Sequence, residues 1–354
     1  MGLAHEKKSY LQEKANLFEI GSLEKSGKEV FRMRKKSDVS MEQVARLSGV
    51  SVSTVSRVIN NTMQISQKTT QKVIDAAHSL QYSNTSKWKE IALIYPDTVM
   101  GIYSLNIVNA LNLRAFKYKM RLIAFHTEAL ETINSRIISG SISFYDSPSV
   151  AEKFSSIFNI PLVCINAPSM HLNNIYATSS DEKQGMKMIF NYLLRRGHCK
   201  IGFLLTGAFK AFINHRRQLA FQECCSIYNI EEKLFYWAGY IPAKKAQLQL
   251  RSILDSGVTA LIVNSENDGL KILLMLQSMG VSIPGDISLV TWDFPDFSAY
   301  SSPPLTAIRQ DYNQLADSAL NLLDKLIKKE KVSKDVLVPY HFCVRRSVCS
   351  RKNK

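Results

Sequence analysis

The sequence predicts a small all-α domain followed by a larger α/β domain that contains two doubly wound parallel sheets. Amphipathic helical patterns crowd residues 39–82, whereas short apolar runs alternate with amphipathic helices after residue 89. Charge divides the chain in the same place, because residues 33–90 contain nine Lys and Arg against four Asp and Glu. The N-terminal part of this 354-residue chain is therefore the part best suited to contact a polyanion.

Residues 1–32 differ from the rest of the chain, because they are charged and only weakly periodic. The residues Gly27 to Val30 can be encoded by a strong bacterial ribosome-binding sequence just upstream of a Met33 codon. We therefore expect translation to begin at Met33, and we interpret residues 1–32 as an extension that is either not translated or disordered. A genuine short N-terminal arm is the alternative.

A capping box opens the first helical pattern. Ser40 stands at the N-cap and Gln43 three positions later, where their side chains can satisfy exposed amides. The expected apolar face comprises Met41, Val44, Ala45 and Leu47. Gly49 then ends the helix, and Ser51 is placed to cap a second one.

The second helix has an unusual outward face, because most of its side chains there are small. We expect an inward face of Val55, Val58 and Ile59 and an outward face of Val52, Ser53, Ser56 and Arg57. A third helix, capped by Ser66, completes a small core with Val73, Ile74, Ala77 and Leu80. Small outward side chains let a backbone approach DNA bases, so the sharp turn and the second helix predict a helix-turn-helix. A generic three-helix module for protein contacts is the alternative.

Strand-like apolar runs recur after a short linker at residues 83–89. They are "KEIALIYPD", "IPLVCIN", "KIGFLLTG", "TALIVNS" and "DISLVTWD". Amphipathic helices lie between them, for example over residues 181–198 and 267–280. This alternation predicts the two doubly wound sheets.

Several classes of protein are disfavoured. No apolar run approaches a membrane span and no secretory segment opens the chain, so we expect a cytoplasmic protein. The six cysteines lack C-x-x-C and metal-ligand spacing, which indicates scattered reduced thiols; they are Cys164, Cys199, Cys224, Cys225, Cys343 and Cys349. Because no nucleotide, nucleophile or metal motif is found, we expect no enzyme activity, no cofactor and no metal.

The segments "GVSVSTVSRVINN" and "ISQKTTQKVIDAAHSLQY" resemble the DNA-binding domain of the lac repressor family of bacterial transcription regulators. The phrases "YLLRRGHCKIGFL", "RRQLAF", "MGVSIPGDISLVTWD", "PPLTAI" and "VRRSV" resemble its effector domain. The resemblance covers Met33 to about Val348. It implies a periplasmic-binding-protein-like domain of two lobes that are joined by three crossovers.

The resemblance also implies domain boundaries. The helix-turn-helix domain takes residues 33–82, and the effector-binding and dimerisation domain takes residues 90–348, with a basic tail at 349–354. Within the effector-binding domain we expect lobe 1 at about 90–165 and 293–324, and lobe 2 at about 166–292 and 325–348.

The resemblance implies site residues as well. Val52, Ser53 and Arg57 are expected to read bases, and the other DNA contacts are Ser51, Thr54, Ser56 and Asn60. Arg217 and Asp293 are expected to contact an effector, together with Ser265 and Tyr103. A guanidinium and a carboxylate that meet across the lobes suit a polyhydroxylated or anionic small molecule. A structural pair or a capping carboxylate is the alternative.

The chain also departs from the family pattern. Ser265 and Glu266 replace an Asn-Asp pair, Thr291 replaces a glycine, and Phe294 follows the effector aspartate. The segment 128–143 is too short for a full helix plus strand. The linker lacks room for the hinge helix and wedge leucine with which the family kinks DNA, so we expect weak coupling between effector and DNA. Trp88 is expected to be an interdomain core residue.

These patterns predict a homodimeric, nucleoid-associated transcription regulator, most simply a repressor, that binds a pseudo-palindromic double-stranded operator. A sugar-like or nucleoside-like effector in the interlobe cleft is expected. The altered cleft indicates either an unusual ligand or a decayed, effector-independent switch. A solute-binding protein is the alternative from another class, although it would have no use for residues 39–80.

Overall fold

The computed structural model describes residues 39–60, 65–80, 82, 88–95, 101–135, 137–144, 148–170, 172–207, 212–237, 243–293 and 297–351. The chain forms two compact units, residues 1–84 and residues 85–354. The predictions for residues 1–32, for linker residues 83–87, for Phe294 and for tail residues 352–354 lie outside the described residues. So do the side chains of Asn60 and Glu266.

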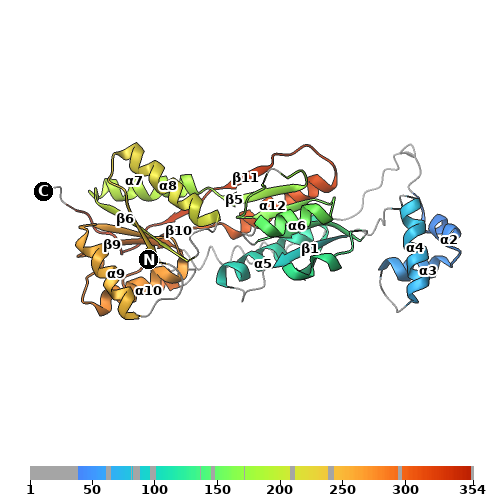
Figure 1. Ribbon diagram of the computed structural model, residues 1–354, viewed down its shortest axis with the longest axis horizontal. Helices are drawn as coiled ribbons and strands as arrows, with labels where there is room; N and C mark the ends of the chain where they lie inside the picture. Colours follow the sequence, from blue (N-terminus) through green and yellow to red (C-terminus); the bar gives the residue numbers. More distant parts are fainter. Residues whose placement is uncertain are drawn as a thin grey trace, which may run out of the picture. The chain divides into compact units, whose positions relative to one another are not determined.

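Three helices make up the described part of the first unit (Figure 1): α2 Met41–Ser48, α3 Val52–Asn60 and α4 Gln67–Ser79. The predicted capping box is confirmed, since the Ser40 hydroxyl accepts from the Gln43 amide while the Gln43 side chain accepts from the Ser40 amide. Gly49 closes α2 in the left-handed conformation at φ 68°. The two caps therefore fix where α2 begins and where it ends.

The core of this unit is built from one stripe of each helix. Its buried residues are Val44, Ala45, Val55, Val73 and Ala76. The expectation that Leu47 belongs to the apolar face of α2 is wrong, because Leu47 is 55% exposed. The inward stripe of α2 runs through positions 41, 44, 45 and 48, so Ser48 is buried instead and donates to the Val44 carbonyl.

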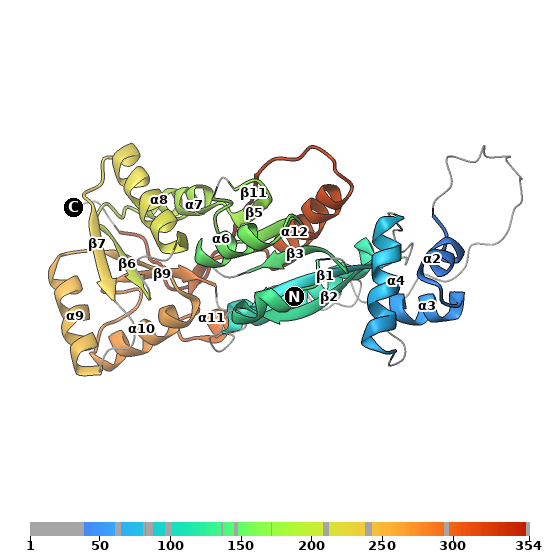
Figure 2. The same ribbon diagram turned by 45° about the vertical axis from the view of Figure 1, so that its right-hand side comes forward.

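The second unit contains two six-stranded sheets in separate lobes (Figures 1 and 2). The first sheet has the order β11-β5-β4-β3-β1-β2, and all its pairs are parallel. Its strands are β1 Lys89–Tyr95, β2 Met120–His126, β3 Ile138–Ser143, β4 Leu162–Ile165, β5 Ile175–Ser180 and β11 Asp335–Val338.

The second sheet has the order β12-β10-β9-β8-β6-β7 and is parallel except for its edge strand β12. Its strands are β6 Ile201–Thr206, β7 Lys233–Trp237, β8 Ala260–Val263, β9 Ser288–Trp292, β10 Thr306–Arg309 and β12 His341–Cys343. The predicted fold, a helical domain followed by two parallel-sheet lobes, is confirmed.

Helices cover both faces of each sheet, as a parallel sheet requires. In lobe 1 they are α5 Ile102–Ala115, η1 Phe116–Tyr118, η2 Thr127–Thr132, α6 Pro148–Ile157 and α12 Tyr312–Ile327. In lobe 2 they are α7 Glu182–Arg195, α8 Phe212–Tyr228, α9 Ala243–Asp255, α10 Glu266–Ser278 and α11 Phe297–Tyr300. Among the described residues, none of the helices combines the length and the apolar character that a membrane span needs.

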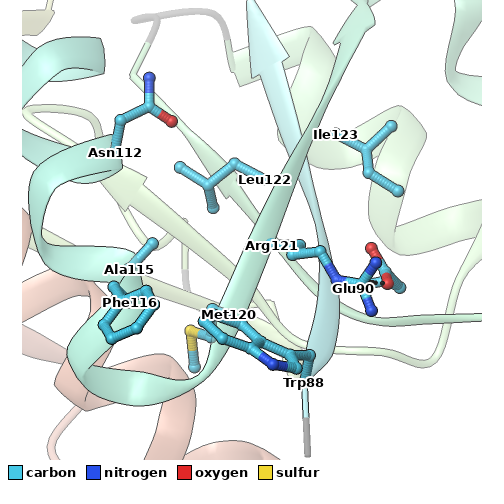
Figure 3. Close-up of a pocket in the computed structure, with 9 residues that line it drawn as sticks. All are labelled: Trp88, Glu90, Asn112, Ala115, Phe116, Met120, Arg121, Leu122 and Ile123. Carbon is cyan, nitrogen blue, oxygen red and sulfur yellow. Dashed lines mark ion pairs between the residues drawn. The ribbon is translucent and has the colours of Figure 1, made fainter. Parts of the chain in front are cut away.

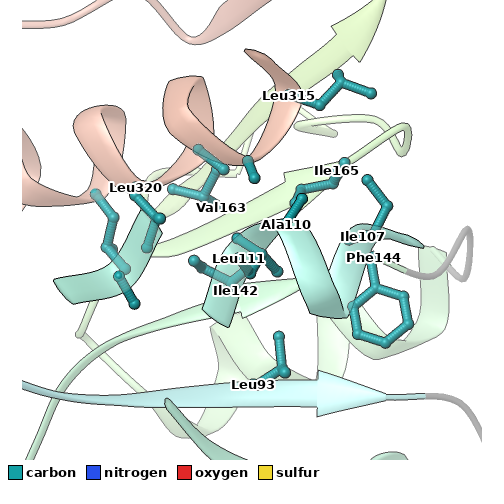
Figure 4. Packing of buried hydrophobic residues seen from close by; sticks show 14 of the residues in the cluster. Leu93, Ile107, Ala110, Leu111, Ile142, Phe144, Val163, Ile165, Leu315 and Leu320 are labelled. Carbon is teal, nitrogen blue, oxygen red and sulfur yellow. The ribbon is translucent and has the colours of Figure 1, made fainter. Parts of the chain in front are cut away.

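The core of lobe 1 shows how distant segments combine. Leu315 and Leu320 of α12 pack with Ile107 and Leu111 of α5 over the strands (Figure 4). The expected shortening between β2 and β3 is confirmed, because the described residues of this connection form the six-residue 3₁₀ helix η2 and no longer helix.

The expected lobe boundaries are wrong at three strands. β5 and β11 pair within the first sheet, and β10 pairs with β9 of the second. β5 reads "IYATSS". Five of its six residues are buried, but three of those five are Thr or Ser, so β5 lacks the apolar run that marks strands such as β4 and β8. The three crossovers between the lobes accordingly lie at residues 180–182, 309–312 and 338–341.

Candidate nucleic-acid interface and interlobe site

The start of α3 is organised by one serine. The Ser51 hydroxyl accepts from the Thr54 amide at 3.1 Å and lies 2.8 Å from the hydroxyls of Ser53 and Thr54. This hydrogen bonding satisfies amides that the first helical turn leaves open. It also gathers three small hydroxyl side chains at the N-terminal end of α3, where the helix dipole attracts anions such as phosphate.

The outward face of α3 is presented as the sequence predicted. Ser51, Val52, Ser53 and Arg57 are exposed, whereas Thr54 and Ser56 are half-buried and Val55 is fully buried. Val55 anchors the helix to α2 and α4. The face that remains offers short hydroxyls, one aliphatic side chain at 40% exposure and one long cation. Such a surface can approach a major groove without steric hindrance.

Lobe 2 contains the expected effector arginine in an unexpected setting. Arg217 of α8 is 8% exposed. Its Nε lies 3.2 Å from Oε2 of Glu182, its Nη1 donates to the Asn264 carbonyl at 2.6 Å, and its guanidinium lies 4.4 Å from the centre of the Trp292 ring. Glu182, the first residue of α7, is 2% exposed, so the two opposite charges compensate each other out of water.

Asp293 is held by a different cation. The Arg345 guanidinium donates to both carboxylate oxygens, to Oδ1 at 2.8 Å and to Oδ2 at 3.2 Å. Asp293 is 3% exposed, and Arg345 also donates to the Leu305 carbonyl at 2.6 Å. This bidentate pair ties the C-terminal strand region to the end of β9.

The structure therefore does not bring Arg217 and Asp293 together as a pair. The expectation that they could meet across the lobes is wrong, because α8 and the end of β9 both belong to lobe 2. Each has its own partner, buried Glu182 for Arg217 and half-buried Arg345 for Asp293, and those partners stand far away in the sequence. A role for either residue in effector binding stays a prediction.

Ser265 and Thr291 have local structural functions. Ser265 caps α10 by accepting from the Asp268 amide at 3.3 Å, and its carbonyl accepts from the Thr291 hydroxyl at 2.9 Å. A Cβ atom on Gly269 would lie 2.1 Å from the Thr291 hydroxyl oxygen. The threonine that departs from the family pattern is thus accommodated by a glycine in the helix facing it.

Tyr103 lies in lobe 1, where its hydroxyl accepts from the Asn166 amide group at 2.8 Å and its ring packs edge-on against Tyr312. Tyr312 also lines a polar hollow of about 370 Å³ between α5 and the crossover at 309–312. The other lining residues are Asn106, Asn109, Ala110, Arg309, Gln310, Asp311, Asn313 and His341. Two atoms of this lining, Nδ2 of Asn106 and Oε1 of Gln310, are buried without a hydrogen-bond partner among the described residues.

Electrostatics in this hollow centre on Asp311. Burial alone would raise the pKa of its carboxyl, but hydrogen bonds from the Gln314 amide and the His341 ring hold the pKa below its ordinary value. Asp311 therefore stays ionised and caps α12. No cluster of metal-ligating side chains is found in the described part of the chain.

Sequence reasoning missed Glu182, Gln310 and Tyr340, which are all more than nine-tenths buried in the interlobe region. Glu182 carries one signal, an acidic side chain in the first turn of a helix, but the same signal fits any ordinary amphipathic helix. Tyr340 carries none, because a tyrosine after a proline near the C-terminus resembles any strand-edge aromatic.

Each of the two units matches known proteins in sequence. Residues 40–84 match the sequence profile "Bacterial regulatory proteins, lacI family", and residues 190–348 match "Periplasmic binding protein-like domain". The transcriptional repressor PurR of Actinobacillus pleuropneumoniae is 27% identical over 337 residues, which are 87% of this chain and 98% of the relative. The sucrose operon repressor of Streptococcus mutans is 24% identical over 84% of this chain and 96% of its own length. These relatives are named as transcription repressors, not as enzymes.

Solved structures show the same fold. The lac repressor dimer bound to operator and the anti-inducer ONPF matches with a TM-score of 0.66 and 22% identity, over 89% of this chain and all of that one. The regulator CelR in complex with cellobiose matches with a TM-score of 0.63 and 20% identity, over 87% and 99% of the two chains. The predicted resemblance is confirmed in the order and kind of both domains.

Proposed function

We propose that this chain, which carries the domain pair of the lac repressor family, is a transcription repressor that binds a pseudo-palindromic operator as a homodimer. The observation that carries the proposal is the outward face of α3. It combines exposed Val52, Ser53 and Arg57 with a hydroxyl-rich N-terminus, on a helix that the Gly49 turn separates from α2.

The individual contacts follow from chemistry. A guanidinium at Arg57 can donate twice to the guanine edge, while Val52 can contact a thymine methyl group. The hydroxyls of Ser51 and Thr54, beside the helix N-terminus, suit phosphate oxygens. Ser53, Ser56 and Asn60 complete the proposed DNA-contacting set.

Two copies are required, because one small helix contacts too few bases for operator-level specificity. A face of α5 offers a surface for the second copy. Leu105 is 55%, Leu113 68% and Phe116 73% exposed, and helical spacing places all three within one stripe. Next to this stripe, Trp88 packs edge-on against Phe116 at 5.0 Å beside a shallow hollow (Figure 3).

The dimer surface is tested by charge insertion. We expect Leu113→Glu combined with Phe116→Glu to shift the protein toward monomer in sedimentation equilibrium, because two buried carboxylates would replace apolar contacts. Leu248→Glu, at a 66% exposed leucine of α9, is the matched control and is expected to leave the dimer intact. Equal dissociation in both variants would move the interface elsewhere.

DNA binding is tested by selecting an operator from random duplexes with the full chain. We expect enrichment of two inverted half-sites, and affinity for the selected site that falls with salt while remaining well above the affinity for random DNA. Failure to enrich any site, or enrichment of a single half-site bound by a monomer, would contradict the proposal.

The effector is proposed to be a neutral, heteroatom-rich molecule such as a sugar or a nucleoside. Both charged groups expected to orient an anionic ligand are committed to Glu182 and Arg345, whereas the polar hollow is rich in amides. Asn106 and Gln310 supply a donor and an acceptor there that have no partner among the described residues. An effector-independent regulator is the second candidate, favoured by those same internal pairs.

Thermal-shift and calorimetric screens separate these candidates. Neutral sugars and nucleosides are expected to stabilise the protein, and Asn106→Ala is expected to weaken the best hit about tenfold. Asn112→Ala, an exposed amide on the same helix, is the control. Lack of any hit would favour the effector-independent regulator. A repressor that acts on operator DNA works in the cytoplasm in association with the nucleoid, which is the location we expect for this chain.

A further inference from the structure

The three crossovers between the lobes converge on one tyrosine. Tyr340 belongs to the crossover at 338–341 and is 3% exposed. Its hydroxyl donates to Oε1 of Glu182 at 2.7 Å, which lies in the first crossover. The Tyr340 hydroxyl oxygen also accepts from Nε2 of Gln310 at 3.3 Å, and Gln310 lies in the second crossover. One phenol oxygen therefore touches both of the other chain passages between the lobes.

Lobe 2 supplies further donors to the same oxygen. The Trp292 indole donates to the Tyr340 hydroxyl at 3.0 Å, and Nη2 of Arg217 lies 3.4 Å away. Burial, followed by the charge of Glu182, raises the pKa of Tyr340 well above its ordinary value. The phenol thus stays protonated and remains a donor to the carboxylate over the whole physiological pH range.

The backbone around Tyr340 adds independent links between crossovers. Its amide donates to Oε1 of Gln184 at 2.9 Å, and the Asp181 amide donates to the Val338 carbonyl at 2.8 Å. A Cβ atom on Gly185 would lie 2.7 Å from the Tyr340 ring, so the glycine lets the ring approach α7 closely.

We propose that Tyr340 is a hinge latch, whose hydroxyl holds the three crossovers in one arrangement and restrains rotation of one lobe against the other. Lobe rotation must change backbone torsions in all three crossovers together. Because the network is buried, parting any of its members leaves polar groups without partners, which is costly in a low-dielectric interior. The latch needs neither ligand nor DNA, so it goes beyond the proposed function.

Hydrogen exchange of the full-length protein tests the latch. Tyr340→Phe removes the hydroxyl and keeps the ring. Peptides that cover residues 178–184, 306–313 and 336–343 are expected to exchange roughly tenfold faster in this variant, because the lost hydrogen bonds no longer oppose local opening. Peptides from β6 and β8, two inner strands of the second sheet, are expected to keep their wild-type rates.

Tyr192→Phe is the matched control, since its hydroxyl is also buried but has no partner among the described residues. It is expected to leave exchange in all three crossovers unchanged. Faster exchange in only one crossover, or an equal acceleration in β6 and β8, would overturn the latch and make Tyr340 an ordinary stabilising residue of lobe 2.

Gln310→Leu keeps the test decisive if Tyr340→Phe does not fold. This change removes one link to the Tyr340 hydroxyl together with an amide oxygen that has no partner among the described residues, so the fold should tolerate it. Exchange over residues 306–313 is expected to rise about threefold with an unchanged melting temperature. Unaltered exchange over that crossover would contradict the proposal. Because none of these readouts involves DNA, their failure is distinct from failure of the proposed repressor function.

Discussion

The outward face of α3 and the interlobe face of lobe 2 use similar side chains in opposite ways. Arg57 is exposed on a helix whose caps and turn direct it outward, whereas Arg217 is buried against Glu182 and the Asn264 carbonyl. The first surface keeps its polar groups available for a partner outside the protein. In the second, groups of the same kinds pair with one another. They therefore stabilise the lobe and are not available to a ligand.

This difference indicates which part of the molecule can recognise something by charge. A ligand that approaches Arg217 must compete with a carboxylate already 3.2 Å from its Nε. DNA that approaches Arg57 replaces only water and counterions. The contrast supports our proposal that the first unit recognises a charged partner such as DNA, and it argues against an effector that binds through the charge of Arg217.

The largest expected effect comes from breaking the internal pair. We expect Glu182→Ala to lower the free energy of unfolding by about 3–5 kcal/mol, because it leaves the Arg217 guanidinium buried without its counter-charge. Urea denaturation followed by fluorescence measures the change. Glu223→Ala, which removes a half-buried carboxylate at the surface from Lys183 and Lys187, is the control and is expected to change stability little. A small loss in Glu182→Ala would show that Arg217 is available to a ligand after all.

The next effect belongs to the outward face. Arg57→Ala is expected to weaken binding to a selected operator by about 1–3 kcal/mol, with little change in binding to random DNA and none in the unfolding curve. Competition binding at fixed salt measures the affinities for the two kinds of DNA. Arg46→Ala, at an exposed arginine in the last turn of α2, serves as the control. An equal loss on both kinds of DNA would make Arg57 a phosphate contact.

Local signals explain why the first unit was predictable from sequence. The capping box at Ser40, the glycine at position 49 and the helical spacing of buried residues such as Val44 and Val55 all act within a few residues. The local sequence pattern is therefore enough to predict these helices. Leu47 was misplaced only because the spacing of one short helix admits two neighbouring stripes. The resemblance of both domains to a known family was visible for the same reason.

Partners far apart in sequence explain what could not be predicted. Glu182 and Tyr340 stand 35 and 123 residues from Arg217, and Arg345 stands 52 residues from Asp293. No spacing rule relates such positions, and strand order alone brings them together. The same limit displaced the lobe boundaries, because β10 and β11 join sheets according to pairing and not according to chain position.

A smaller effect tests how the turn positions α3. Gly49→Ala is expected to destabilise the first unit by about 1 kcal/mol, since a Cβ atom is strained at φ 68° although nothing lies within 4 Å of it. Helicity monitored during heating of the full chain reports the first transition. Gly101→Ala is the matched control, because Gly101 has an ordinary φ of −76° and equal space around it. Equal stability of the two variants would indicate that the turn is not held in the left-handed conformation.

The smallest expected effect concerns pH and the buried groups of lobe 2. His198 is fully buried, and its ring nitrogens lie 3.0 Å from the Thr259 hydroxyl and 3.0 Å from the Cys349 carbonyl. Burial lowers the pKa of His198, and the charges of Arg351 and Arg196 lower it further, against an opposing contribution from the Cys349 carbonyl. The folded protein therefore keeps this ring neutral at pH values where the unfolded chain already binds a proton.

Because the unfolded state binds more protons in that window, stability should rise with pH through it and fall as the pH drops below the ordinary histidine value of about 6.5. The loss should level off once the pH lies below the folded-state pKa. His198→Gln keeps hydrogen-bonding groups but does not titrate, so unfolding free energies measured between about pH 5 and pH 8 should flatten in this variant. His215→Gln, at an exposed histidine of α8, should retain the wild-type slope. If the slope survives in His198→Gln, the proton uptake belongs to another group, and the buried polar side chains of lobe 2 tolerate charge better than their internal pairing implies.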